Sequence, residues 1–497
     1  MADIKPGVTR QFCSWVEGLT LRDVPGEMQT RAKYLILDGL GCAIVAAHLP
    51  WTEKATNIVL GMEAEGSCPV WGYDKVRSLA LVVGHWCQEV ADSSQTIGPL
   101  PAALLNSTQI QGFEIDDWHS LAPVHSNAIV LPALFAAAAN AKAKGTVTSG
   151  ESLLLSTIVG YEAGPRVGLC LYGSHMLSRG WHSGVVFGHA QAAAAVAKLL
   201  NLPADRIEDA VGIACTQSCG LMSAQFSSDA KRMQHGFAAR NGLFAALLAA
   251  GGYSGIKNVF EEPYGGFLTA FSQGSGKEPP FLEQELVKGL GETWQLENIR
   301  VKPYAAMAGT HSSIDAMAAL QKEYPDKLKQ LSEIKKITFE MSESAYKHGG
   351  WTAQRPLTAT GAQMSCAYAA AVQLIDGQVL AEQFQDGLLD RDERWELIGK
   401  IECRQTEELG NVMSQRAIIE FKDGSKISKY VAAAKGVDPP LSNQEIVQKF
   451  RTFTKALISE ERQRKIEETV LGLESVEDIS ELQDLLTGLT SSPFKGA

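Results

Sequence analysis

A series of stretches in the first 275 residues repeats apolar side chains with the period of an α-helix, and many of them are rich in alanine and glycine. Small side chains let neighbouring helices approach closely, and a helix that is apolar on all sides is expected to lie inside a protein. Strand-like alternation is nearly absent, so the sequence predicts a packed helical bundle. The predicted helices cover residues 30–47, 79–90, 126–144, 149–164, 188–200, 207–218 and 236–250.

The pattern changes after a polar, Gly/Pro-rich segment at residues 274–280. Residues 334–341 alternate as a strand does, and residues 416–431 are typical of a hairpin that turns at Asp423 and Gly424. Helical patterns at residues 312–322 and 362–375 lie between these strands. The sequence therefore predicts a second domain of the α+β class.

Helical patterns return after Pro439 and Pro440, at residues 443–457 and 460–471. We expect this tail to rejoin the first domain, so that the α+β domain is an insertion. The predicted fold is mostly α with an α+β second domain. Its boundaries are 1–275 for the first part of the helical domain, 276–438 for the α+β domain and 439–497 for the C-terminal part of the helical domain.

The composition excludes several classes of partner. The net charge is −11 and no Lys/Arg-rich run is present, which argues against a nucleic-acid groove or an anionic membrane surface as the main partner. The nine cysteines are scattered and mostly have apolar neighbours, as reduced thiols usually do. No apolar stretch has the length of a membrane span, and the first residues lack a signal-peptide pattern. We expect a cytoplasmic protein.

Residues 114–125 combine three carboxylates with two imidazoles just before a predicted helix. They are Glu114, Asp116, Asp117, His119 and His125. A carboxylate can orient an imidazole and favour its charged form for proton transfer. The spacing matches no standard zinc pattern, so no metal is predicted, and the alternative reading is a solvated loop that caps the helix.

Residues 231–235 place Lys231, Arg232, Gln234 and His235 ahead of the apolar helix predicted at 236–250. Backbone N–H groups and the helix dipole favour an anion there, and a polycarboxylate would fit. The alternative is an ordinary solvated turn, although cations oppose the dipole unless an anion is near.

Further imidazoles and cations stand at other predicted helix starts. His182 precedes an apolar helix and, by itself, is more typical of a structural role, as is His189 inside that helix. Lys302, Tyr304 and His311, at the entrance of the second domain, could hold a carboxylate. A GxGxxG motif that opens a βαβ unit, a P-loop and HExxH are all absent from the sequence, so no cofactor is predicted.

Taken together, these segments resemble the MmgE/PrpD superfamily over nearly the whole chain, from about residue 8 to residue 486. The segment Lys231 to Gly242 is the most specific match. The other matching segments are residues 31–39, 116–132, 180–182, 212–217, 220–225, 264–268 and 355–356.

The resemblance implies a cofactor-free enzyme and a homodimer, with a helical domain formed by both chain ends and an inserted α+β lid. Carried over by position, the active-site histidines of the family fall on His125 and His182, and its lysine falls on Lys231. Its acidic residue falls on Glu114 or Asp116.

Within the family, the chain is most similar to the branch that decarboxylates cis-aconitate to itaconate and CO2, which implies a carboxy-lyase. Lys231 and His125 would bind the tricarboxylate and stabilise charge, and His182 is the leading proton donor, with Lys231 and His125 as alternatives. Further expected substrate ligands are His119, Gln234, Lys302, Tyr304 and His311.

Two other functions remain open at this point. Relatives in other branches dehydrate 2-methylcitrate or alkylcitrates, and the same imidazoles and carboxylates could remove an α proton and help hydroxide leave. The third reading is a helical binding protein without activity. The presence of His125, His182 and Lys231 together counts against it.

Overall fold

The computed structural model describes residues 6–74, 96–225, 228–409 and 413–494, and it divides into two compact units. Unit 1 comprises the chain up to Met222 together with Asp229–Ile299 and Asn443–Ser492, and Arg300–Ser442 makes up most of unit 2. The helix predicted at residues 79–90, with Cys87, lies outside the described residues.

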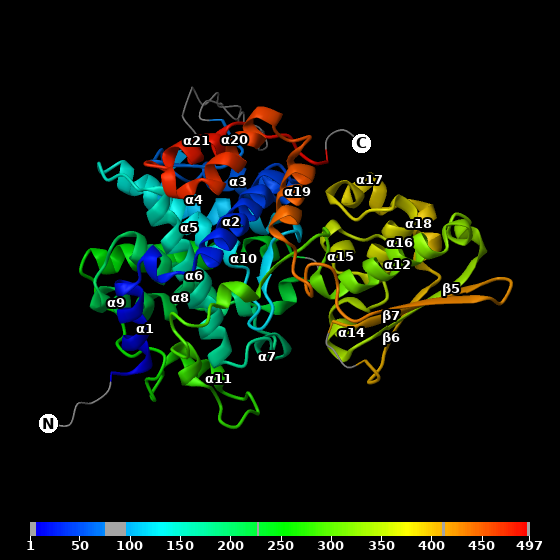
Figure 1. Ribbon diagram of the computed structural model, residues 1–497, viewed down its shortest axis with the longest axis horizontal. Coiled ribbons are helices and arrows are strands. Elements are labelled where there is room, and N and C mark those ends of the chain that lie inside the picture. The colour runs from blue at the N-terminus through cyan, green and yellow to red at the C-terminus, as the bar shows by residue number, and fades with distance from the viewer. Residues whose placement is uncertain (1–5, 75–95, 226–227, 410–412, 495–497) are drawn as a thin grey trace. The chain divides into compact units, whose positions relative to one another are not determined.

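Unit 1 is a bundle of helices, which confirms the predicted fold class (Figure 1). Its helices from the first part of the chain are α1 (Val8–Gly18), α2 (Gly26–Ala46), α3 (Pro50–Leu60), α4 (Pro99–Ile110), α5 (Ser126–Lys142), α6 (Gly150–Cys170), α7 (His175–Ser178), α8 (Ser183–Leu199), α9 (Ala204–Cys215), α10 (Ala230–Ala250) and α11 (Phe267–Ser272). The tail adds α19 (Asn443–Thr454), α20 (Glu460–Leu471) and α21 (Ser480–Thr487). Helix α19 packs against α2, and Asn443–Ser492 belongs to unit 1.

Helix α10 packs against α4, α5, α8 and α9. Its glycines permit this: a Cβ at Gly236 would lie 2.7 Å from the carbonyl oxygen of Leu104, and one at Gly242 would lie 2.4 Å from the Cβ of Ala192. The helix begins at Ala230 rather than at residue 236. The basic segment that we expected ahead of the helix therefore forms its first turns.

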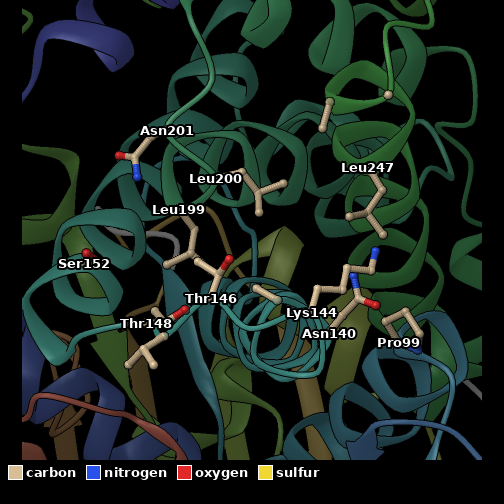
Figure 2. A pocket seen from close by; sticks show the side chains of 14 residues that line it. Pro99, Asn140, Lys144, Thr146, Thr148, Ser152, Leu199, Leu200, Asn201 and Leu247 are labelled. Carbon is tan, nitrogen blue, oxygen red and sulfur yellow. The ribbon is translucent and has the colours of Figure 1, made fainter.

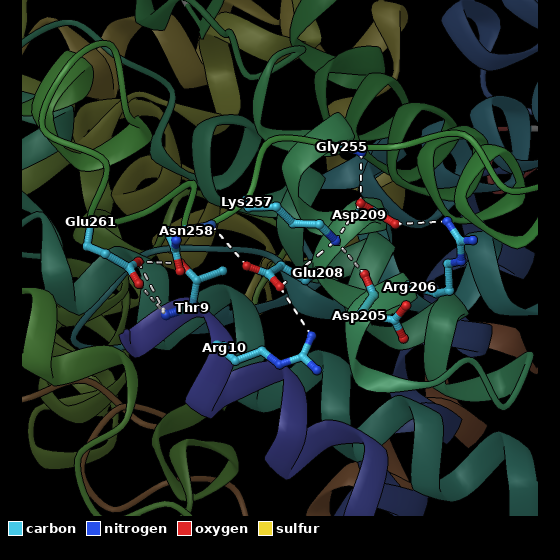
Figure 3. Close-up of polar contacts among 10 residues, drawn as sticks. All are labelled: Thr9, Arg10, Asp205, Arg206, Glu208, Asp209, Gly255, Lys257, Asn258 and Glu261. Carbon is cyan, nitrogen blue, oxygen red and sulfur yellow. Dashed lines mark hydrogen bonds and ion pairs between the residues drawn. The ribbon is translucent and has the colours of Figure 1, made fainter. Parts of the chain in front are cut away.

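A network of charged and polar groups ties α1 and α9 to the segment after α10 (Figure 3). Glu208 accepts hydrogen bonds from Arg10, at 3.3 Å, and from the backbone N–H of Asn258, at 2.9 Å. Asp209 accepts one from the backbone N–H of Gly255, at 3.0 Å, and pairs with Lys257 at 2.6 Å. These contacts hold the segment after α10 against α1 and α9.

The segment between residues 276 and 299, which the sequence analysis assigned to the second domain, belongs to unit 1. Arg166, buried in α6, donates hydrogen bonds to the backbone carbonyls of Lys288, at 2.7 Å, and Thr293, at 2.8 Å. Glu162, also in α6, accepts one from the backbone N–H of Leu296 at 3.1 Å. Arg166 and Glu162 form a buried ion pair within α6. Together they hold residues 288–296, although this stretch resembles a linker in composition.

Short strands lie beside the helices of unit 1. Strand β1 (Cys68–Pro69) pairs antiparallel with β2 (Thr96–Ile97), and β3 (Asp117–His119) lies within the carboxylate-rich segment at residues 114–125. Strand β4 (Ile299–Val301) spans the boundary between the units.

Unit 2 contains a four-stranded sheet in the order β6-β5-β7-β8. The strands are β5 (Ile334–Met341), β6 (Ile401–Gln405), β7 (Gln415–Phe421) and β8 (Lys426–Val431), with β5 parallel to β6 and antiparallel to β7. The hairpin of β7 and β8 turns at Gly424, whose φ of 81° suits glycine. Strand β6 was not predicted, because this edge strand lacks the alternating burial that marks β7.

The helices of unit 2 include α12 and α16, which contact the sheet. They are α12 (His311–Glu323), α13 (Pro325–Leu328), α14 (Glu343–Gly349), α15 (Ala359–Gln363), α16 (Cys366–Asp376), α17 (Asp386–Leu389) and α18 (Asp392–Ile398). The predicted α+β class of this unit is confirmed.

Among the described residues, no single helix combines the length and apolar character needed to cross a membrane. The helices Gly26–Ala46 and Pro50–Leu60 meet these conditions only as a pair, across a bend of 85°.

Candidate active site

The loop before α5 positions a carboxylate against an imidazole. Asp116 Oδ2 lies 2.8 Å from Nδ1 of His125, the residue that caps the N-terminus of α5. The neighbouring Asp117 accepts a hydrogen bond of 3.0 Å from the backbone N–H of Asn127. Asp116 is buried, whereas 19% of the His125 side chain is exposed. The loop therefore places a buried carboxylate against one partly exposed imidazole.

The first turn of α10 carries a pair of buried cations that share one carboxylate. Lys231 and Arg232 both donate hydrogen bonds to Glu114, and the Arg232 bond measures 3.0 Å. Arg232 also lies over the ring of Trp51, 5.5 Å from its centroid, in a cation–π contact. The cations that oppose the dipole of α10 thus have an anion of the protein itself beside them.

His182 caps the N-terminus of α8 and belongs to the same cluster. Its backbone N–H donates to the carbonyl of Gly220 at 3.2 Å, which fixes the ring at the start of the helix. Burial, together with the nearby charges of Lys231 and His125, lowers the pKa of His182 to about 3. His182 is therefore neutral near pH 7.

A third imidazole, that of His235, lies between the other two. Its ring centroid is 4.8 Å from that of His125 and 4.9 Å from that of His182. Helix α10 supplies both His235 and Lys231, while α5 and α8 supply the other histidines at their starts. The structure thus brings together His125, His182 and Lys231, which are far apart in the sequence.

The sequence analysis placed His235 in the basic segment but assigned it no role. The sequence signal for this contact is Gly184, two residues after His182. In the structure, a Cβ at Gly184 would lie 2.4 Å from Nε2 of His235. A glycine at that place lets the imidazole approach the first turn of α8.

Other predicted ligands of unit 1 have partners within the protein. Gln234 donates to the backbone carbonyl of Leu221 at 2.9 Å. His119 is fully buried, and its Nδ1 accepts a hydrogen bond of 3.0 Å from the backbone N–H of Ala122. These contacts support the surrounding loops, and contact of either residue with substrate stays a prediction. His189 is buried with Nδ1 2.7 Å from the Val185 carbonyl, in keeping with the structural role expected for it.

Three predicted ligands belong to unit 2, and their part in the site stays a prediction. Lys302 is buried, and Tyr304 donates a hydrogen bond of 2.5 Å to Asp315. His311 is also buried, with Nε2 2.8 Å from the backbone carbonyl of Ala306.

Other features of the described chain offer less chemistry. Within the described ranges, no group of three or more His, Cys, Asp or Glu side chains is arranged to hold a metal ion.

A surface pocket of about 620 Å³ is lined by residues of α5, α8 and α10 and by the loop between α5 and α6 (Figure 2). Its polar groups include Lys144, Asn140 and Thr146, and the histidines of the cluster do not line it.

Comparisons with known proteins match the chain along almost its whole length. A model of the MmgE/PrpD N-terminal domain matches residues 10–280, and a model of the MmgE/PrpD C-terminal domain matches residues 304–475. The chain is 47% identical to the cis-aconitate decarboxylase-like protein oryM of Aspergillus oryzae, over 97% of both chains. It is 44% identical to the cis-aconitate decarboxylase of Aspergillus terreus, over 99% of this chain and 98% of the other. The human cis-aconitate decarboxylase is 26% identical, over 97% and 95% of the two chains.

Proposed function

We propose that this chain, which belongs to the MmgE/PrpD family, is a carboxy-lyase that converts cis-aconitate to itaconate and CO2 without a cofactor. The observation that carries the proposal is the buried cluster of His125, His182 and Lys231. Full-length similarity to decarboxylases of Aspergillus supports the choice of substrate.

The reaction needs a binding site for a tricarboxylate, a place for negative charge and a proton. The bond to the leaving carboxylate breaks at the carbon next to the alkene, and its electron pair forms a new double bond to the central carbon. The electron pair of the old double bond moves to the far alkene carbon, which takes a proton. The carboxylate on that carbon helps to carry the developing charge, so pre-oriented cations and one acid suffice.

Asp116 and His125 form the most suitable proton donor. A carboxylate 2.8 Å from Nδ1 orients the imidazole, and a protonated imidazole held in this way can deliver a proton from Nε2. The sequence analysis put His182 first and left His125 as an alternative. A pKa of about 3 for His182 favours His125 as the donor.

Lys231 is proposed to bind a carboxylate of the substrate and to stabilise the developing charge. The fixed charges of the cluster balance, because Glu114 and Asp116 oppose the two cations of α10. A bound tricarboxylate adds negative charge beside the imidazoles and so favours their protonated forms. Substrate binding is therefore expected to be accompanied by proton uptake.

The direct test is turnover of purified protein with cis-aconitate in the presence of a chelator, followed as CO2 and itaconate. Lys231→Met should lower kcat by about 100- to 1,000-fold, because it removes a preorganised charge from the reacting centre. Lys54→Met is the matched control: Lys54 is an exposed lysine that pairs with Asp229 just before α10, and turnover should not change.

Two outcomes would contradict the proposal. An alkene product from 2-methylcitrate or an alkylcitrate, without turnover of cis-aconitate, would indicate a dehydratase. Tight binding of these acids without turnover of any would indicate a binding protein. Wild-type turnover by Lys231→Met would contradict only the role assigned to that residue.

We further propose a homodimer, which the surface of unit 1 supports. An apolar groove of about 800 Å³ runs between α3, α4 and α10, and 70% of Met62 and 41% of Phe244 are exposed there. Exposed apolar patches often mark interfaces, and a second copy can cover such a patch symmetrically. A cytoplasmic location is also proposed, supported by the free thiols of the described cysteines.

Phe244→Glu is expected to shift the protein from dimer to monomer, because it places a charge in the apolar groove. Light scattering after size-exclusion chromatography measures the change. Tyr430→Glu, at a half-exposed site in β8, is the control and should remain dimeric. A dimer that persists in Phe244→Glu would exclude this groove as the interface.

A further inference from the structure

His235 combines complete burial with an uncommitted side chain. It has no exposed surface, and within the described part of the chain neither ring nitrogen has a hydrogen-bond partner. Its backbone N–H donates to Gln111 Oε1 at 3.2 Å. Buried polar groups are nearly always paired, so an imidazole left in this state calls for a functional reason.

The surroundings of His235 consist of the proposed reacting groups. The rings of His125 and His182 lie 4.8 and 4.9 Å from it, tilted by 58° and 75°. The charged groups that face it are Asp116 and Lys231. Gly184 keeps open the space next to Nε2. His235 therefore touches both imidazoles that the site presents.

Burying an imidazole at this position costs more free energy than burying an apolar ring of similar shape. A phenyl ring has nearly the same shape and carries no polar atoms to desolvate. Burial and the neighbouring histidines hold the pKa of His235 well below its usual range, so the ring is neutral. A neutral imidazole offers one N–H donor and one acceptor, which can pair with a neighbouring imidazole in either tautomer.

We propose that His235 is a positioning residue: it packs between His125 and His182 and becomes the hydrogen-bond partner of one of them when the tricarboxylate is bound. The inference rests on the proposed function for the identity of the substrate. The spacing and burial of the three rings support it independently of that identity.

The first test asks whether turnover depends on the shape of the His235 ring or on its nitrogen atoms. His235→Phe keeps a ring between the two imidazoles but removes its nitrogens, and it should lower kcat by roughly 10- to 100-fold with little change in KM. His235→Gln should recover part of this loss, because its amide can pair with an imidazole. Circular dichroism and thermal melting confirm that each variant is folded.

The second test measures the pKa of His182 by NMR titration of histidine-labelled protein. His235→Ala should admit water beside His182 and raise the pKa of that ring from about 3 towards its usual range, while His235→Phe should keep it low. His189→Phe is the matched control, because His189 is equally buried but lies outside the cluster. It should change stability without moving the His182 titration or the pH profile of kcat.

Wild-type kcat and pH profile in His235→Phe would overturn the proposal, since the ring would then only fill space. An unchanged His182 titration in His235→Ala would also overturn it. If the wild-type protein does not decarboxylate cis-aconitate, the proposed function fails, and the titrations still decide the role of His235.

Discussion

Replacing Lys449 with methionine is expected to lower the free energy of unfolding by about 3–5 kcal/mol, the usual cost of removing one partner from a buried ion pair. Lys449 Nζ lies 2.6 Å from Asp38 Oδ1, and both side chains are almost completely buried. Burial opposes the charge of Lys449, but Asp38 together with Cys42 and Asp116 raises the pKa of Lys449. The variant would leave the carboxylate of Asp38 charged or force it to take up a proton.

The same lysine supports the candidate active site. Lys449 also donates a hydrogen bond to the backbone carbonyl of Ile115, the residue before Asp116. Helix α19 near the C-terminus thereby braces the loop that holds the Asp116–His125 pair. We expect Lys449→Met to lower kcat as well as stability.

Urea unfolding of Lys449→Met measures the loss, and two variants serve as controls. Lys465→Met removes an exposed pair with Glu461 within one helix and should cost no more than about 0.5 kcal/mol. The double variant Lys449→Met/Asp38→Asn should recover part of the loss, because no unpaired charge remains. A loss below about 1 kcal/mol in Lys449→Met would show that the pair contributes little.

Two buried histidines are expected to destabilise the protein as the pH falls below 6.5. Burial lowers the pKa of His182 to about 3 and that of His189 to about 4. In the unfolded chain both histidines titrate near 6.5, so between pH 6.5 and about 4 the unfolded state binds more protons than the folded state. The free energy of unfolding therefore falls as pH falls, by about 1.4 kcal/mol per pH unit for each histidine.

His189→Gln isolates one of these contributions. Its free energy of unfolding should fall less steeply between pH 6.5 and 4, by about 1.4 kcal/mol per pH unit relative to wild type. Urea unfolding across this range measures both slopes, and comparing them removes the contribution of carboxylates common to both proteins. Equal slopes would mean that His189 carries a proton in the folded protein.

Local patterns in the sequence predicted most of the fold. Strand β5 and helix α20 begin and end at the predicted residues, because alternation and helical periodicity are strong there. The start of α10 was misplaced by six residues, since its first turns are polar and resemble a loop. Strand β6 was not predicted because its residues do not alternate between buried and exposed. It is a strand because its backbone pairs with β5, and local sequence does not reveal that pairing.

Candidate site residues could be named from the sequence and the family resemblance, whereas most of their pairwise contacts could not. The family resemblance pointed to His125 and His182, and both occupy the N-cap positions of helices. The pairing of Glu114 with both Lys231 and Arg232 was not foreseen, because these residues are more than a hundred positions apart. Nor was His235 recognised as the ring between the two histidines.

The sequence by itself determined the class of most segments, the presence of an α+β part after a helical one and which side chains can carry charge, because periodicity, capping and composition act over a few neighbouring residues. Only the tertiary structure decided which of those side chains are partners and which are neutral. Burial and the charges of distant segments set those properties, as the low pKa of His182 and the pairing of Lys449 with Asp38 illustrate.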